Sequence, residues 1–362
     1  KCMDKVRLVK RLGGMFVRYR GYIAMVMFTF VMITALGVLT PYISNTVFYD
    51  DVLTEGGRFY GEIGKMVLLI VGVRIVSLLV SLVNGICGED VGREYVKRHF
   101  PETSKQRMEQ LVGNLIDAYR VSISNSTWLG DETKAKALEK LSKFVPKIGY
   151  TNHWRDYSAL DVREDAGFAQ NMRAANLYET GYQLAKVGKA VDKDEWLMTP
   201  QTVNAYYMPT TNEICFPAAI LQPPFFYPEG DDAINYGAIG VVIGHEMTHG
   251  FDDQGRQFDK DGNLNDWWTA ADAEAFQERA EKLVEPYSSK IVLDTVHANG
   301  RYTLGENIAD QGGLRIAYTA FKAAEKENPY TENIDGFTPD QRFYLAYARL
   351  WATNIRDEEI LR

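Results

Sequence analysis

The part of this chain that most constrains its fold and chemistry is the pentad H-E-M-T-H at residues 245–249. If this segment is helical, residues four positions apart share one face, so His245 and His249 can reach a single Zn²⁺ ion. Glu246 would then lie beside the metal, where it can accept a proton from water. The alternative interpretation is a charged, solvent-exposed helical turn that binds nothing. The pattern favours a helix that carries two metal ligands and a general base.

The residues around the pentad predict a buried helix from Asp231 to Gly250. Asp231 can cap the first free N–H groups, and Gly250 suits the left-handed residue that often closes a helix. Within this helix, Gly237, Gly240 and Gly244 weaken helix propensity, and we expect them to allow another backbone to approach closely. Histidines and a glutamate in such a core are costly unless a metal ion organises them.

A catalytic zinc site takes a third protein ligand from elsewhere in the chain. The strongest candidate is Glu306, because Asp310 lies four residues later on the same helical face and can accept a hydrogen bond from a ligand imidazole. The competing third ligand is His297, which lies in a turn-like stretch. Glu306 and Asp310 can also be interpreted as the solvated acidic face of an ordinary helix. Spacing alone leaves these alternatives open.

Residues 203–217 predict a β-hairpin whose first strand lies at a sheet edge. The segment from Val203 to Met208 is rich in β-branched and aromatic residues and stops at Pro209. A Thr-Thr-Asn turn and a second apolar strand follow. An edge strand can pair with an extended peptide through backbone hydrogen bonds, although an ordinary exposed hairpin would give the same pattern.

Together these segments resemble the neprilysin family of zinc endopeptidases over about residues 92–362. The resemblance is carried, in chain order, by N-A-Y-Y at 204–207, V-V-I-G-H-E-M-T-H-G-F-D-D-Q-G-R at 241–256 with D-W-W at 266–268, and G-E-N-I-A-D at 305–310. It implies an α+β, predominantly α, catalytic domain of the gluzincin (thermolysin-like) type. It also implies hydrolysis of internal bonds of oligopeptides by water activated at one Zn²⁺ per chain.

The resemblance also assigns roles to individual residues. The histidine and the arginine that stabilise the oxyanion in the family correspond to positions after Arg362, so we expect this chain to bind zinc but to be weakly active or inactive. The implied zinc ligands are His245, His249 and Glu306. The implied catalytic residues are Glu246, as general base, and Asp310. Asp310 and Asp252 would orient the histidines, and Asn204 and Ala205 would hold the substrate backbone.

The first 90 residues predict a transmembrane helical hairpin. Tyr22 to Leu39 is an uncharged, largely apolar run of 18 residues, near the minimum for a membrane span. Seven basic residues precede it against one acid, which places the N-terminus in the cytoplasm. The second run, 66–86, contains Arg74 and would therefore face a partner helix or water. The alternatives are a cleaved signal peptide for the first run and a buried soluble helix for the second.

Residues 41–53 weakly resemble the first membrane hairpin of ATP-binding-cassette exporters. We therefore expect a membrane hairpin at residues 1–90 fused to an incomplete zinc metallopeptidase domain at residues 91–362. One inserted span would leave the catalytic domain outside the cytoplasm, whereas two would return it there. The rival function is a membrane transport or interaction subunit that carries an inactive zinc-binding peptidase fragment. A zinc-stabilised scaffold without turnover is a third alternative.

Composition limits the partners and the compartment. The net charge is −8 and no basic patch occurs, which argues against a nucleic-acid partner. Cys2, Cys87 and Cys215 are too few and too widely spaced for a disulfide framework. Because secreted animal members of the family are rich in cysteine, the resemblance implies a bacterial relative. We expect a membrane-associated protein, attached through residues 22–39, whose substrate is an oligopeptide.

Overall fold

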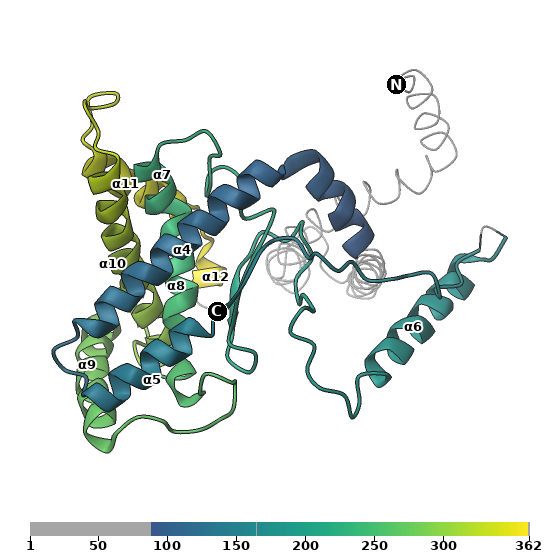
Figure 1. Cartoon of the computed structure of the whole chain (residues 1–362), viewed down its shortest axis with the longest axis horizontal. Coiled ribbons are helices and arrows are strands. Elements are labelled where there is room, and N and C mark those ends of the chain that lie inside the picture. The colour runs from purple at the N-terminus through teal and green to yellow at the C-terminus, as the bar shows by residue number, and fades with distance from the viewer. Residues whose placement is uncertain (1–87, 164, 361–362) are drawn as a thin grey trace, which may run out of the picture. The chain divides into compact units, whose positions relative to one another are not determined.

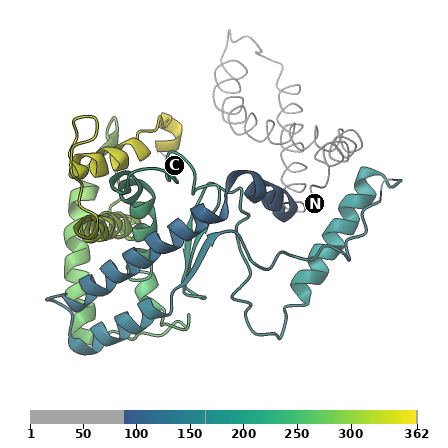
Figure 2. The same ribbon diagram turned by 45° about the horizontal axis from the view of Figure 1, so that its top comes forward.

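The computed structural model describes residues 88–163 and 165–360, which Figures 1 and 2 show in two views. The chain divides into a unit of Lys1–Gly88 with Tyr157–Ala185, which contains helix α6 (Phe168–Leu184), and a unit of Glu89–Asp156 with Lys186–Arg362. Every predicted site residue belongs to the second unit. The predicted spans and the exporter-like stretch lie outside the described residues. Over the described ranges, no helix has both the length and the apolar character that a membrane span requires.

The second unit is predominantly helical, in agreement with the predicted fold class. Helix α8 packs lengthwise against α10, and α4 packs against both of them (Figure 1). The core between these helices is apolar and includes Leu115, Ile243, Met247 and Phe321. Residues 88–99 are also helical, and the named helices are α4 (Glu102–Ser124), α5 (Asp131–Ser142), α7 (Asp232–Asn235), α8 (Val241–His249), α9 (Ala270–Ser288), α10 (Leu304–Glu327), α11 (Pro339–Leu350) and α12 (Asp357–Ile360).

A three-stranded sheet lies beside the helices, with the strand order β1-β3-β2. Its strands are β1 (Val145–Gly149), β2 (Tyr206–Met208) and β3 (Glu213–Pro217). The antiparallel pairing of β2 with β3 confirms the predicted hairpin, and its position confirms β2 as an edge strand. β1 adds to the other side of β3 in parallel. A separate two-stranded sheet contains β4 (Ile291–Leu293) and β5 (Val296–His297).

The predicted helix between Asp231 and Gly250 forms in three parts. α7 is followed by a π-helical turn, η2 (Tyr236–Gly240), and then by α8. The Asp231 carboxylate accepts the N–H of Ala233 at 3.0 Å, which confirms it as the cap. The prediction that Gly250 is left-handed is wrong, because its φ is −61°. It is instead a close-packing position, since a Cβ there would lie 2.7 Å from the ring of Phe144.

Two of the three helix glycines allow the close backbone approach that the sequence predicts. A Cβ on Gly244 would lie 2.8 Å from the carbonyl oxygen of Gly313 in α10, and a Cβ on Gly237 would lie 2.2 Å from that of Phe343 in α11. At Gly240 the nearest atoms would be 3.5 Å away, so the prediction is wrong there. Gly244 on α8 therefore lets α10, and the side chains it carries, come within reach of the histidines.

Candidate metal site

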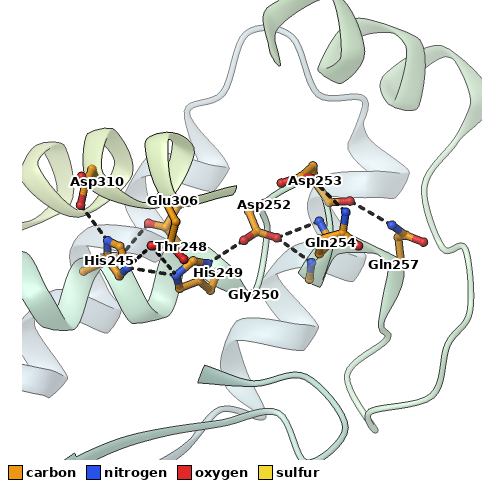
Figure 3. A network of polar contacts seen from close by, with 12 residues as sticks. His245, Thr248, His249, Gly250, Asp252, Asp253, Gln254, Gln257, Glu306 and Asp310 are labelled. Atoms are coloured by element: carbon orange, nitrogen blue, oxygen red, sulfur yellow. Dashed lines mark hydrogen bonds and ion pairs between the residues drawn. The ribbon is translucent and has the colours of Figure 1, made fainter. Parts of the chain in front are cut away.

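The three predicted ligands come together from two helices. His245 and His249 lie one turn apart on α8, with their Nε2 atoms 3.0 Å apart and their rings at 87° (Figure 3). Glu306, in the first turn of α10, places Oε2 at 3.3 Å from Nε2 of His245 and at 3.8 Å from Nε2 of His249. One ligand atom from each of the three residues fits within a span of 4.8 Å. The competing ligand, His297, lies on β5, where its Nδ1 is 3.2 Å from the carbonyl oxygen of Ser288.

Each histidine has a carboxylate on the side of the ring that faces away from the other. Nδ1 of His245 lies 2.9 Å from Oδ1 of Asp310, and Nδ1 of His249 lies 2.6 Å from Oδ2 of Asp252 (Figure 3). A carboxylate accepts, so each Nδ1 carries a proton, and in the neutral form that binds a metal each ring presents its Nε2 lone pair. Two lone pairs then face one another at close range. Such a pair is unfavourable unless a positive charge lies between them.

The electrostatics of the site point to the same need for a cation. Burial by itself would lower the pKa of His245, but its hydrogen bonds to Asp310 and Glu306 outweigh burial and raise the pKa to about 10. Burial likewise opposes the rise in the pKa of His249 that the Asp252 carboxylate produces. The hydrogen bond to His245 lowers the pKa of Glu306. The carboxylates thus make this part of the chain strongly attractive to a proton or a metal ion.

The donor set fits a tetrahedral divalent ion. Ligand atoms about 2.1 Å from such an ion lie roughly 3.4 Å from one another. The observed separations of 3.0, 3.3 and 3.8 Å bracket that value. Two imidazoles and one carboxylate also form a donor set that Zn²⁺ accepts with one position left for water. The residues present therefore fit zinc without rearrangement of the helices.

Glu246 lies between the two histidines in sequence and is buried, with 8% of its surface exposed. Burial raises the pKa of its carboxyl group above the ordinary value. The backbone N–H of Tyr207, in the edge strand β2, donates a hydrogen bond to this carboxylate. The sequence did not predict this contact, because it joins two segments almost forty residues apart. It connects the predicted general base directly to the predicted substrate-binding strand.

A cavity of about 420 Å³ opens over these groups. Its lining includes Asn204 and Ala205, just before β2, so the structure brings both predicted substrate-binding residues to the metal site. Four other lining residues, Pro209, Gln254, Gly255 and Phe258, were not predicted from the sequence to belong to the site. Three of them follow the helix directly, and their position after the pentad is the signal that could have identified them.

Comparison with known proteins agrees with this architecture. The sequence profiles of peptidase family M13 match residues 74–151 and 204–362. The match begins before residue 92, where the resemblance was expected to start, and takes in part of the apolar run 66–86. The chain is 40% identical to an endothelin-converting enzyme homolog of Locusta migratoria over an alignment of 286 residues, which covers 76% of this chain and 39% of that protein. It is 38% identical to neprilysin-3 of Drosophila melanogaster over 301 residues, covering 79% of this chain and 38% of that protein.

Among solved structures, the chain superposes on the zinc metalloprotease Zmp1 of Mycobacterium tuberculosis, in complex with an inhibitor, with a TM-score of 0.71. The two sequences are 49% identical, and the match covers 77% of this chain and 43% of that one. The helical fold and the His-His-Glu donor set place the chain in the class of metallopeptidases. More narrowly, the chain belongs to peptidase family M13. It spans about two fifths of the length of the curated relatives it matches.

Proposed function

We propose that this chain carries the zinc site of an endopeptidase that hydrolyses internal bonds of oligopeptides, with a catalytic domain of the thermolysin-like, gluzincin type. The observation that carries the proposal is the convergence of His245, His249 and Glu306, with the Nδ1 atom of each histidine held by a carboxylate. The family membership and the zinc metalloprotease named among the solved structures support it. We assign zinc, one ion per chain, to this donor set.

Zinc bound by these three residues would act as a Lewis acid that polarises the substrate carbonyl and makes water more acidic. The chain's own contribution to proton transfer is Glu246. As water attacks the peptide carbon, Glu246 accepts its proton, and it then returns the proton to the leaving amine as the C–N bond breaks. The raised pKa of this buried carboxyl group favours the first step, because a stronger base accepts the proton more readily.

The substrate backbone is proposed to lie along β2. This strand forms the edge of the sheet, so its outer side can pair with an extended peptide through backbone hydrogen bonds. Asn204 and Ala205 line the cavity just before the strand begins. A peptide held there would pass beside Glu246, since the Tyr207 N–H donates to its carboxylate. Residues 204 and 205 would therefore set the position of the scissile bond relative to the general base.

Attachment to a membrane through residues 22–39 remains part of the proposal. It is supported by the uncharged run and the basic residues before it. Together with the second run, 66–86, this segment would insert as a hairpin that includes the exporter-like stretch 41–53. A bacterial origin is supported by the 49% identity to the Mycobacterium tuberculosis protein. Partition of the chain between membrane and soluble fractions, compared with a variant that has two lysines inserted into 22–39, tests the attachment.

The metal and the activity are tested together. We expect close to one zinc per chain by elemental analysis, with the metal lost in His245→Ala and retained in Glu246→Gln. Any cleavage of a quenched oligopeptide should be abolished by a chelator and by Glu246→Gln. A wild-type chain without zinc, or cleavage that survives Glu246→Gln, would contradict the proposal. Zinc binding without any cleavage would favour the zinc-stabilised scaffold.

A further inference from the structure

Lys140, in the last turn of α5, is a buried cation, with 1% of its surface exposed. Its Nζ atom donates to the carbonyl oxygens of Gly250 at 2.7 Å, Gly255 at 2.8 Å and Phe258 at 2.7 Å. A lysine ammonium has three N–H donors and no acceptor. The three carbonyls therefore use its full hydrogen-bonding capacity, and all three belong to one stretch of backbone, the post-helix turn at residues 250–258.

The post-helix turn carries Asp252, the carboxylate that holds His249. Oδ1 of Asp252 accepts the N–H groups of Gln254 at 2.9 Å and Gly255 at 2.6 Å, while Oδ2 accepts from the imidazole (Figure 3). Gly255 is thus held on both sides, its N–H by Asp252 and its carbonyl by Lys140. The ammonium and the carboxylate therefore act on the same residue, through the two peptide units that flank it.

The turn has little freedom to shift. It folds back over the end of α8 so closely that a Cβ on Gly255 would lie 1.7 Å from the carbonyl oxygen of His249. On its other side, the α5 backbone is tied to the hairpin, because Asn212 donates from its side chain to the carbonyl oxygen of Lys140 at 3.1 Å. Lys140 therefore joins a rigid helix to the turn at three points.

The position is a costly one for a charge. The rings of Phe251, Tyr207 and Trp267 lie 5.6, 5.8 and 6.0 Å from Nζ. Burial lowers the pKa of Lys140 to about 7, against the attraction of Asp252 and Asp259. An apolar side chain of similar length would fill the same space without that cost. What the ammonium group adds over such a side chain is three hydrogen bonds to the carbonyl oxygens of the turn.

We propose that Lys140 is a positioning residue of the metal site, which clamps the post-helix turn so that Asp252 stays aligned with Nδ1 of His249. The inference rests on the proposed zinc site. Without the clamp, the turn can move away from α8 and the carboxylate loses its fixed distance to the imidazole. Loss of an outer partner of a ligand histidine typically weakens metal binding 10- to 100-fold.

The test compares Lys140→Met, which removes all three donors, with Lys140→Gln, which keeps two, and with Lys140→Arg, which keeps the charge. Lys143→Met, at an exposed position just after α5, is the matched control. Zinc dissociation constants are measured on the full chain by chelator competition, and Co²⁺ spectra report the symmetry of the ligand field. We expect zinc affinity about 10- to 100-fold weaker and an altered Co²⁺ spectrum in Lys140→Met, partial rescue in Lys140→Arg, and no change in Lys143→Met.

A double variant separates positioning from general stabilisation. If Lys140 acts through Asp252, then Lys140→Gln combined with Asp252→Asn should bind zinc within about threefold of Asp252→Asn alone. Fully additive losses, or unchanged affinity and spectrum in folded Lys140→Gln, would overturn the inference. If Lys140→Met does not fold, Lys140→Gln decides. A wild-type chain that binds no zinc would instead overturn the proposed function, so the two failures are distinguishable.

Discussion

Nδ1 of His249 lies 2.6 Å from Oδ2 of Asp252, a residue just beyond the C-terminal end of α8. The orientation of the second ligand of the pentad therefore depends on the turn that follows the helix. For His245 the corresponding carboxylate is Asp310, which belongs to α10. The two imidazoles are thus held by two different parts of the fold, a local turn and a helix that is distant in sequence.

Asp252→Asn is expected to weaken zinc binding about 10- to 100-fold, because a neutral amide is a poorer acceptor for the Nδ1 proton and no longer raises the basicity of the imidazole. Competition with a chelator of known affinity measures the change. Asp253→Asn is the control, since the Asp253 carboxylate accepts from the side chain of Gln254 and not from a histidine (Figure 3). Equal losses in the two variants would show that the effect is not specific to the His249 contact.

Gly313→Ala is expected to destabilise the chain and to weaken zinc binding together. A Cβ at this position would lie 2.6 Å from the backbone nitrogen of His245 and 2.7 Å from the carbonyl oxygen of Val241, so α10 must move away from α8 and take Glu306 with it. Overpacking of this kind costs about 1–3 kcal/mol. Gly113→Ala in α4 has no atom within 4 Å of the new Cβ and should stabilise by up to about 1 kcal/mol. Thermal unfolding with and without zinc measures both.

Local features of this fold could be predicted from the sequence because their causes lie within a few residues. The Asp231 cap of α7, the β2–β3 hairpin and the one-face spacing of His245 and His249 are of this kind. Gly250 shows the limit. A glycine can serve a left-handed turn or a close contact, and the choice at this position depends on Phe144, which is about a hundred residues away in the chain.

The H-E-M-T-H motif could be identified from the sequence, but the residues that complete the metal site around it could be predicted only in part. Spacing left Glu306 and His297 as alternative third ligands, because it does not say which helix or strand packs on α8. Lys140 lies at helical spacing from buried Ala137 and Phe144, which is a signal for burial, but the neighbouring lysines and glutamates suggest a solvated face. Its partners are backbone carbonyls, which leave no trace in the identity of side chains.

Asp272 is expected to give a stability contribution that depends on pH. Hydrogen bonds from the hydroxyls of Thr133 and Thr269, and then from the N–H of Gly130, lower the pKa of its carboxyl group, although burial opposes them. Because the folded pKa lies below the unfolded value of about 3.9, the stabilisation is fully present above about pH 4 and is lost as the pH falls through the folded pKa. Asp272→Asn should therefore lower the unfolding temperature at pH 7, and the difference from wild type should shrink below about pH 4. Exposed Glu274→Gln should show neither effect.

The edge strand β2 is held in place through a buried ion pair in the sheet. Nζ of Lys147 on β1 lies 2.8 Å from Oε2 of Glu213 on β3, and both side chains are at most 5% exposed. The hydroxyl of Tyr206 on β2 donates to the other oxygen of Glu213 at 2.8 Å. All three strands of the sheet therefore meet at one carboxylate. The position of the proposed substrate-binding strand depends on this group.

Lys147→Met is expected to destabilise the chain by about 3–5 kcal/mol, because it leaves the Glu213 carboxylate buried without its cation. Lys147→Met combined with Glu213→Gln should recover most of that loss, since the neutral amide still accepts from Tyr206. Urea unfolding followed by tryptophan fluorescence measures both. The exposed pair of Lys97 and Glu94, 2.7 Å apart, supplies the control, and Lys97→Met should change stability by less than about 1 kcal/mol. If the double variant is as unstable as Lys147→Met, then the missing cation is not the cause, and the lost hydrogen bond to the carbonyl of Glu195 would account for the effect.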